Sequence, residues 1–150
     1  VPLLMVAPGR SAVKARTSAL VELIDLFPTL TELCHLPTPA GLEGTTLTPL
    51  LNDPRGTVKA AAFTQHPRPA YFDREPDQQP RAMGVSVRTE AGRYTEWRDW
   101  KTGALVGREF YIAADEPAET VNRIDDPRHT AAQSIAEQVL HQQFPPRSSP

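Results

Sequence analysis

The sequence predicts a mixed α/β chain in two parts, and two patterns of apolar residues support this. Residues 1–36 contain one uninterrupted apolar run and one helical pattern with an early proline. Residues 37–150 contain runs in which apolar and polar residues alternate, then one helical pattern near the end. An uninterrupted run is typical of a strand covered on both faces, whereas alternation is typical of an antiparallel sheet with one exposed face. We therefore expect an α/β fragment in two parts, the first with a strand and a helix, and the second with an antiparallel sheet and a helix near the C-terminus.

The composition excludes several classes of protein. A length of 150 residues suits one ordinary domain, or one domain with a segment of another. The 16 basic and 18 acidic residues give a formal net charge of -2, which provides no electrostatic basis for binding nucleic acid or an anionic membrane. No apolar run approaches the roughly 20 residues of a membrane-spanning helix. The single cysteine, Cys34, excludes an intramolecular disulfide and a multi-cysteine zinc site.

The first element is the apolar run Val1–Pro8, which predicts a buried strand closed by Gly9. A buried strand rarely begins a protein, so we expect the full-length protein to continue upstream of Val1. Residues 10–18 follow with three basic side chains and no apolar period, and they predict a surface loop.

The second element is a helix that begins at Asp25, after a short extended piece over residues 20–24. Asp25 can accept hydrogen bonds from the amides of the first turn, and Pro28 lies in that turn, where its missing N–H does no harm. The prolines and glycine after residue 36 end the helix. The expected buried stripe consists of Leu26, Leu30 and Leu33.

The segment that follows, residues 37–57, is rich in Pro, Gly and Thr and marks the boundary between the two parts. Within it, the leucines at positions 47, 50 and 51 predict one short packed turn. Beyond it, residues Lys59–Thr64 predict a strand, and residues Gln65–Pro80 predict a polar loop that contains four prolines.

The remaining elements follow from alternation and helical spacing. Residues Met83–Thr89 and Arg93–Trp97 alternate on either side of a three-residue connection that contains glycine, which signals a β-hairpin. Residues Glu109–Ile112 predict a further antiparallel strand. Residues Thr130–Phe144 predict a helix, with Ile135, Val139 and Leu140 at helical spacing.

Few residues of the sequence indicate chemistry. The four histidines are scattered, so each taken alone is expected to be a surface or capping residue and not a metal ligand. Cys34 lies in an apolar context and is expected to act as a small apolar side chain and not as a nucleophile. The serines lack the nucleophile-elbow pattern, and the glycines form neither a phosphate loop nor a dinucleotide fingerprint. The sequence therefore indicates no catalytic residue and no metal ligand.

The start of the predicted loop after residue 64 is the exception. Gln65, His66 and Arg68 place an amide, an imidazole and a guanidinium on a segment stiffened by two prolines. Such a segment can present hydrogen-bond donors to an anionic substrate. The alternative is that Arg68 pairs with a carboxylate inside the fold, and the sequence leaves both interpretations open.

Six segments, taken in order, resemble the C-terminal portion of sulfatases in the alkaline phosphatase-like superfamily, and in particular the iduronate-2-sulfatase-like branch. They are VPLLMVAPG at residues 1–9, LIDLFPTL at 23–30, the glycine and leucines of 44–51, FTQHPRP at 63–69, MGVSVRT and RYTEW within 83–97, and EFY with Asp115, Pro117, Glu119 and Asn122 within 109–122. The sequence departs from the family at two of these positions. His66 stands where a tyrosine is usual, and Ile112 stands where an aspartate usually follows the tyrosine.

The resemblance implies hydrolysis of a sulfate ester at a calcium site, by a formylglycine made from the cysteine of a Cys-x-Pro-Ser-Arg motif. Cys34 is followed by His35, Leu36 and Pro37, so this sequence lacks that motif. In the family, the metal-binding carboxylates and the sulfate-binding lysines precede the strand that corresponds to residues 1–9. The resemblance therefore implies no catalytic residue, no metal ligand and no cofactor in this chain, and it assigns calcium to the complete sulfatase.

By the same resemblance, residues 1–36 are the last strand and helix of the large α/β sulfatase domain. Residues 37–150 are then the smaller C-terminal subdomain, with an antiparallel sheet and a C-terminal helix. The expected function is to complete a hydrolase of sulfated sugars and to shape its substrate site through Gln65, His66 and Arg68, without catalysis by this chain alone. The expected partners are the N-terminal catalytic portion and the sulfated sugar. The alternative is a stand-alone, non-catalytic binding or assembly module with the same fold.

Overall fold

The computed structural model describes residues 3–10, 15–73, 75, 77–113 and 119–147. The chain forms two compact units, residues 1–60 (unit 1) and residues 61–150 (unit 2). Residues 37–60 thus belong to the same unit as the helix before them, whereas the sequence places a domain boundary after residue 36. The assignment of the two predicted parts to the two domains of a sulfatase stays a prediction.

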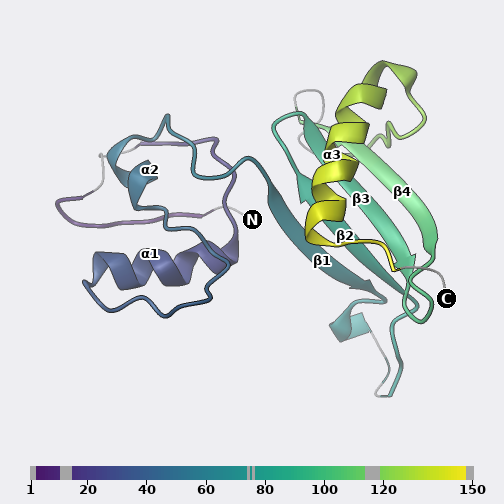
Figure 1. The fold of residues 1–150 in the computed structure, drawn as a ribbon, viewed down its shortest axis with the longest axis horizontal. Helices are drawn as coiled ribbons and strands as arrows, with labels where there is room; N and C mark the ends of the chain where they lie inside the picture. The colour runs from purple at the N-terminus through teal and green to yellow at the C-terminus, as the bar shows by residue number, and fades with distance from the viewer. Residues whose placement is uncertain (1–2, 11–14, 74, 76, 114–118, 148–150) are drawn as a thin grey trace. The chain divides into compact units, whose positions relative to one another are not determined.

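Unit 1 contains a 3-10 helix, η1 (Leu23–Asp25), followed directly by α1 (Leu26–Leu33), and a short helix, α2 (Thr48–Asn52) (Figure 1). The α-helix begins after Asp25 and carries Pro28 in its first turn, as the sequence predicts. The predicted capping by Asp25 is wrong, because its side chain accepts no hydrogen bond from the first-turn amides of α1. The predicted extended piece over residues 20–24 is wrong at Leu23 and Ile24, which belong to η1. The predicted packed turn is also confirmed, because α2 has Leu50 buried and is preceded by buried Leu47.

The buried face of α1 differs from the prediction. Its buried residues are Pro28, Thr29 and Thr31, whereas Leu30 is exposed. Both threonine hydroxyls have hydrogen-bond partners there: the N–H of Leu47 donates to Thr29 Oγ1 at 2.8 Å, and the Thr31 hydroxyl donates to the Pro28 carbonyl oxygen at 3.0 Å. A buried amide must have a hydrogen-bond partner, and a threonine hydroxyl supplies one where a leucine cannot.

A buried ion cluster fixes the start of α1. The Asp25 carboxylate is fully buried and accepts hydrogen bonds from Lys59 Nζ at 2.6 Å and from the backbone N–H groups of Thr45 and Glu22 at 2.8 and 2.7 Å. Burial by itself would raise the pKa of Asp25, but these hydrogen bonds, led by that from Lys59, lower the pKa below its ordinary value. The cluster therefore joins three separate segments of unit 1.

The predicted buried strand over residues 1–8 is wrong for the part of it that the structure describes. Residues 3–7 have no regular secondary structure, and Leu4 and Val6 are 91% and 81% exposed. A strand needs a neighbour that exchanges backbone hydrogen bonds with it. The described residues of unit 1 contain no other strand to serve as that neighbour.

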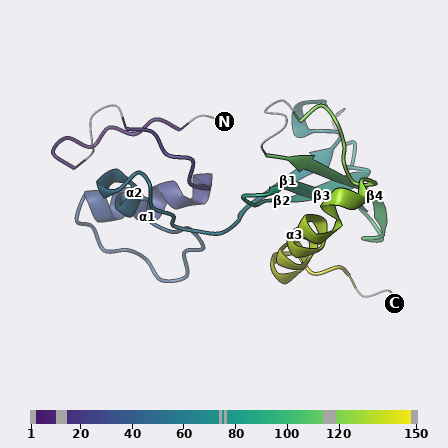
Figure 2. The ribbon, with the colours of Figure 1, turned by 90° about the horizontal axis from the view of Figure 1, so that it is seen from above.

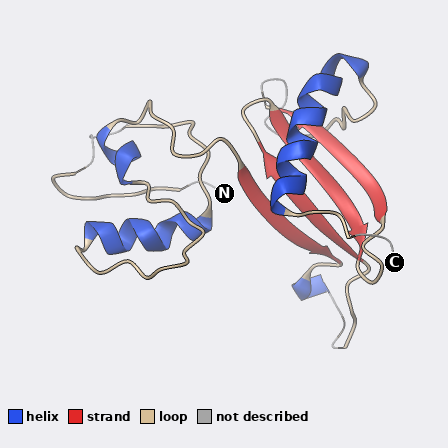
Figure 3. Cartoon of the chain, viewed as in Figure 1, coloured by secondary structure: helices blue, strands red, loops and turns tan. Residues whose placement is uncertain are grey.

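Unit 2 is a four-stranded antiparallel sheet in the order β1-β2-β3-β4, with helix α3 against one face (Figure 2). The strands are β1 (Ala62–Arg68), β2 (Ala82–Arg88), β3 (Gly92–Asp99) and β4 (Leu105–Ile112), and α3 covers Thr130–Gln143. Two 3-10 helices, η2 (Tyr71–Asp73) and η3 (Pro127–His129), lie in the connections (Figure 3). The core between α3 and the sheet consists of Val85, Val87, Tyr94, Phe110, Ala136 and Leu140.

Unit 2 confirms most of the predicted elements. The hairpin is formed by β2 and β3, β4 includes the predicted strand Glu109–Ile112, and α3 ends one residue before the predicted end. Leu140 is fully buried as its spacing predicts, whereas Ile135 is exposed. No helix within the described ranges is long and apolar enough to cross a membrane.

The first strand of unit 2 is shifted relative to the prediction. It covers Ala62–Arg68 rather than Lys59–Thr64, so the predicted site residues lie on a strand and not on a loop. Pro67 cannot donate a backbone hydrogen bond, which argues against a central strand. Because β1 is an edge of the sheet and pairs only with β2, one of its sides needs no donors, and the proline is tolerated.

Candidate functional site

Strand β1 divides the predicted site residues between the two faces of the sheet. Phe63 packs edge-on against Phe144, the residue after α3, with ring centroids 5.9 Å apart. Successive side chains of a strand point to opposite faces. Gln65 therefore shares the face covered by α3 with Phe63, whereas His66 and Arg68 share the opposite face, which we call the far face. The structure brings His66 and Arg68 together and separates Gln65 from them.

An aromatic ring holds Arg68 on the far face. The guanidinium carbon of Arg68 lies 3.5 Å from the centroid of the Trp97 ring, which is a cation–π contact. Trp97 Nε1–H in turn donates a hydrogen bond to Glu109 Oε1 on β4 at 2.9 Å. Within the described ranges no carboxylate forms an ion pair with Arg68, so the alternative of a carboxylate partner finds no support there.

Tyr111 on β4 adjoins the same group. Burial raises the pKa of the Tyr111 phenol, the neighbouring Glu109 carboxylate raises it further, and the positive charge of Arg68 acts in the opposite direction. The phenol therefore stays protonated at neutral pH and can donate a hydrogen bond.

Two arginines meet at the other end of the far face. Arg88 on β2 and Arg93 on β3 are direct cross-strand partners, which places like charges side by side. Glu119 offsets this repulsion, because its Oε1 accepts hydrogen bonds from Arg88 Nη1 at 3.3 Å and from Arg93 Nε at 3.0 Å. One carboxylate serves two guanidinium groups, so the three side chains together stay positively charged.

The far face therefore combines guanidinium, imidazole, indole and phenol groups. The forked N–H groups of arginine match the oxygens of a sulfate or a carboxylate. Aromatic faces pack well against apolar ring faces of a ligand. This arrangement can bind an anionic, ring-shaped ligand, but the described residues of the far face contain no serine, cysteine or threonine hydrogen-bonded to a general base.

A second polar cluster lies on the other face of the sheet, under α3. Glu96 on β3 is 3% exposed, and its carboxylate accepts hydrogen bonds from Arg98 Nε and Nη2 at 2.9 and 2.7 Å. His141 Nε2 donates to Glu96 Oε1 at 2.8 Å, and the Tyr94 hydroxyl lies between Glu96 and Glu137 at 3.2 and 3.3 Å. Burial alone would raise the pKa of Glu96, but the hydrogen bonds from Arg98 and His141 lower the pKa below its ordinary value.

This cluster does not fit the calcium that the family resemblance implies. Glu96, Glu137 and His141 place three ligand atoms within 4.8 Å of one another. Calcium takes six to eight oxygen ligands, whereas this group includes an imidazole, and Arg98 already occupies the Glu96 carboxylate. The sequence alone does not predict this cluster. The spacing of Glu137 and His141, four residues apart on one helix, is visible in the sequence, but their partner on β3 is not.

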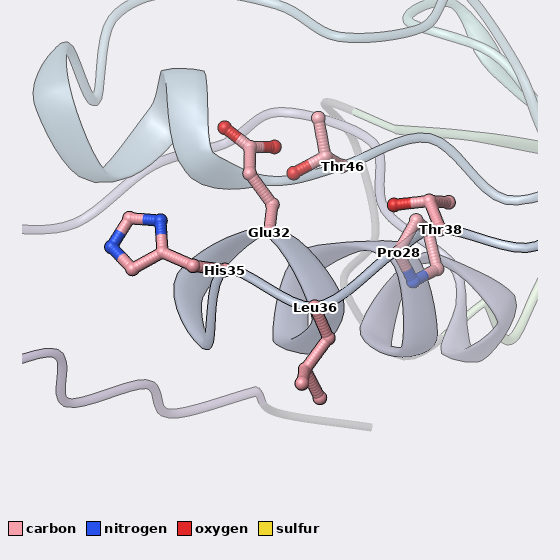
Figure 4. A pocket seen from close by; sticks show the side chains of 6 residues that line it. All are labelled: Pro28, Glu32, His35, Leu36, Thr38 and Thr46. Carbon is pink, nitrogen blue, oxygen red and sulfur yellow. The ribbon is translucent and has the colours of Figure 1, made fainter.

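Unit 1 has a shallow hollow of about 520 Å³ at the C-terminal end of α1 (Figure 4). Glu32 points toward Thr46, and Leu36 points away from the other labelled side chains. Glu32 Oε1 accepts a hydrogen bond from Thr48 Oγ1 at 2.7 Å, and the hydroxyls of Thr46 and Thr48 lower the pKa of Glu32. Because a carboxylate repels an anion, this hollow is unsuited to a sulfate group. None of the predicted site residues lines it.

The family model and the similar curated proteins both identify sulfatases. Residues 1–144 match the family model described as N-sulphoglucosamine sulphohydrolase, C-terminal. The chain is 29% identical to iduronate 2-sulfatase of Mus musculus, covering 75% of this chain and 26% of that protein. It is also 29% identical to arylsulfatase K of Rattus norvegicus, covering 81% of this chain and 21% of that protein. The chain thus spans about a quarter of the length of these relatives.

Solved structures show the same fold. A 2-O GAG sulfatase matches 80% of this chain with a TM-score of 0.63 and 23% identity, over 24% of its own length. A protein solved in complex with its substrate D-glucosamine-2-N,6-O-disulfate matches 79% of this chain with a TM-score of 0.60 and 19% identity, over 23% of its own length. The chain therefore belongs to the N-sulphoglucosamine sulphohydrolase C-terminal family and has the fold of a sulfatase C-terminal region.

Proposed function

We propose that this chain is the C-terminal part of a sulfatase-like hydrolase of sulfated sugars, that it completes the fold of that enzyme, and that it shapes the substrate site. The family match and the sulfatase relatives support this proposal, as does the disulfated glucosamine bound by one protein of similar fold. We assign the nucleophile and the calcium of the complete enzyme to the N-terminal catalytic portion. This chain supplies groups that bind and orient the substrate, and it does not hydrolyse sulfate esters alone.

The observation that supports the proposal most directly is the exposure of the Arg68 side chain and its contact with Trp97. This arginine side chain is exposed on an edge strand, and its guanidinium is stacked on Trp97 instead of being paired with a carboxylate of the described residues. The charge is therefore available to a sulfate or carboxylate group of a ligand. His66 is also exposed, on the same face of β1 and two residues earlier, a spacing of about 7 Å in a strand. Its imidazole can donate a hydrogen bond to the same ligand.

The test uses the full-length sulfatase that contains this chain. We expect His66→Ala and Arg68→Ala each to raise KM for sulfated sugars about threefold to tenfold and to leave kcat near that of the unmodified enzyme, because each removes a hydrogen bond to the bound substrate. Gln65→Ala should change KM less, since Gln65 lies on the face covered by α3. The matched control is Thr64→Ala, an exposed neighbour on the same face as His66.

Two results decide the outcome. Unchanged kcat/KM for both His66→Ala and Arg68→Ala across several sulfated sugars would remove these residues from the substrate site. An equal loss of kcat/KM in Thr64→Ala would show that any substitution on β1 disturbs the enzyme. The melting temperature is measured alongside, and it should move little in all four variants because these side chains are exposed.

The proposal also gives unit 1 a partner, the N-terminal catalytic portion. Leu23, Phe27 and Leu30 recur along one side of η1 and α1 and are 76%, 53% and 56% exposed. We call these three residues the exposed stripe. Contiguous apolar side chains of this kind mark surfaces that pack against another part of a protein. The relatives of this chain are about four times as long as the chain itself, which leaves room for such a part. We therefore assign the exposed stripe to packing against the catalytic portion.

A further inference from the structure

The indole of Trp97 lies across the neighbouring strand β2. Trp97 on β3 is the direct cross-strand partner of Gly84 on β2. A Cβ atom at position 84 would lie 2.7 Å from Cζ3 and 2.9 Å from Cη2 of the Trp97 ring. Distances this short are not compatible with the present ring position, so only glycine leaves the space that the indole occupies. The ring can therefore extend over β2 toward the edge strand β1.

The other strands place Arg68 and Glu109 on opposite sides of this ring. Gly84 pairs with His66 on β1, and Arg68 lies two residues beyond His66 on the same face. The guanidinium carbon of Arg68 reaches to 3.5 Å from the ring centroid. On the β4 side, the Glu109 carboxylate accepts the hydrogen bond from Trp97 Nε1 at 2.9 Å. Three strands thus determine where the guanidinium lies.

Stacking on the indole leaves the N–H donors of the Arg68 guanidinium accessible to a ligand. Its N–H donors lie in the plane of the group, whereas the contact with the indole uses the face of that plane. An arginine that moves freely must lose rotamer freedom when it binds an anion, and a guanidinium already held on a ring has lost much of it beforehand. A ring fixed at both ends is therefore suited to hold an arginine that binds a ligand.

We propose that Trp97, fixed by Glu109 and accommodated by Gly84, is a positioning residue that orients Arg68 to bind a sulfate or carboxylate group of the sugar substrate. This inference rests on the proposed function, in which Arg68 contacts the substrate. Trp97 acts through Arg68 and does not itself contact the anionic group. The competing explanation is that the stack only stabilises the edge of the sheet.

The test is a double-mutant cycle in the full-length sulfatase that contains this chain. The variants are Arg68→Ala, Trp97→Leu and the two combined, with glucosamine 2-N,6-O-disulfate as the probe. Trp97→Leu keeps an apolar side chain but removes the aromatic face. We expect it to raise KM about threefold to tenfold with little change in kcat, the size of effect expected for loss of a cation–π contact. In the Arg68→Ala background, the same substitution should add almost nothing, because both changes remove one interaction.

Conservative and control variants keep the inference falsifiable if Trp97→Leu does not fold. Trp97→Phe keeps an aromatic face and should recover part of the lost affinity, whereas Gly84→Ala displaces the ring and should raise KM. Lys101→Ala removes an exposed positive charge from the turn between β3 and β4 and should leave KM unchanged. Melting temperatures identify any variant that loses activity because it unfolds. If the stack only stabilises the sheet, its loss should lower the melting temperature without a selective change in KM.

The outcomes separate the inference from the proposed function. If Arg68→Ala leaves KM unchanged, Arg68 does not bind the substrate, and the assignment of this residue under the proposed function fails. If Arg68→Ala raises KM but Trp97→Leu, Trp97→Phe and Gly84→Ala do not, Arg68 binds without help from Trp97 and the inference is overturned. Additive effects of Arg68→Ala and Trp97→Leu would also overturn it, because Trp97 would then act independently of Arg68.

Discussion

Replacing Glu96 by alanine should destabilise unit 2 more than any exposed substitution. Glu96 is almost completely buried and joins β3 to the last turns of α3 through His141 and Arg98. Arg98 is itself largely buried and also donates hydrogen bonds to the carbonyl oxygens of Phe144 and Pro145 at 2.9 and 3.3 Å. Glu96→Ala removes the only carboxylate that pairs with Arg98 among the described residues and leaves the guanidinium beneath α3.

The expected loss of unfolding free energy in Glu96→Ala depends on the environment in which Arg98 is left. Removing one partner of a buried ion pair costs about 3–5 kcal/mol, because the remaining charge stays desolvated. The two carbonyl groups at the end of α3 compensate part of this cost, so we expect a loss of about 3 kcal/mol, near the lower limit of that range. Replacing both residues, with Glu96→Leu and Arg98→Met, removes both charges and should cost only about 1 kcal/mol, the value of the lost hydrogen bonds to the helix end.

Urea denaturation followed by tryptophan fluorescence measures this loss. Both tryptophans, Trp97 and Trp100, lie in unit 2, so the signal reports the unfolding of that unit. With a denaturant slope of about 2 kcal/mol/M, the midpoint should fall by about 1.5 M for Glu96→Ala. The control Glu90→Ala, in the exposed turn between β2 and β3, should stay within about 0.5 kcal/mol of the unmodified chain. A loss below about 1 kcal/mol for Glu96→Ala, with an unchanged slope, would refute the reasoning.

Three further predictions concern pH, unit 1 and its partner. Because folding lowers the pKa of Glu96, its carboxylate stabilises the folded state fully above pH 4.5, and this stabilisation is lost as the pH falls through the lowered pKa. Glu96→Gln should therefore reduce the fall in unfolding free energy below pH 4.5, and an unchanged pH profile would contradict this. Lys59→Met leaves the buried Asp25 without its ammonium partner and should cost about 3 kcal/mol, seen as faster hydrogen exchange over residues 22–52; unaltered exchange would speak against it. Leu30→Ser should change the stability of the chain by less than about 0.5 kcal/mol but weaken its association with a separately expressed catalytic portion, and equal association of both forms would exclude the exposed stripe from that interface.

Elements that depend on local pattern could be predicted from the sequence. The hairpin of β2 and β3 follows from alternation around a glycine-containing turn, and α3 follows from helical spacing over more than three turns. The start of α1 follows from the proline in its first turn. The expected capping by Asp25 does not form, because its carboxylate binds Lys59 and the backbone N–H of Thr45 instead. Each of these signals lies within one short segment, so no knowledge of the rest of the fold is needed to interpret it.

Features that depend on contacts between distant segments could not be predicted. The buried face of α1 carries Thr29 because the backbone amide of Leu47, 18 residues away, donates to its hydroxyl, which no helical periodicity reveals. The extent of β1 depends on its place at the edge of the sheet, where Pro67 is tolerated. The stack of Arg68 on Trp97 and the burial of Glu96 under α3 likewise require the strand register. The family resemblance includes both FTQHPRP and RYTEW, but a linear motif does not show that the two segments meet in the fold.

The position of a bound substrate tests the role of Arg68 without reference to kinetics. The measurement is a crystal structure of the full-length protein that contains this chain, the proposed sulfatase, with an uncleaved sulfated sugar bound. We expect an oxygen of a sulfate or carboxylate group within about 3 Å of an Arg68 guanidinium nitrogen, with the guanidinium still stacked on Trp97. An ordered substrate that makes no contact with Arg68 or His66 would contradict the proposal that this chain shapes the substrate site through the far face of unit 2.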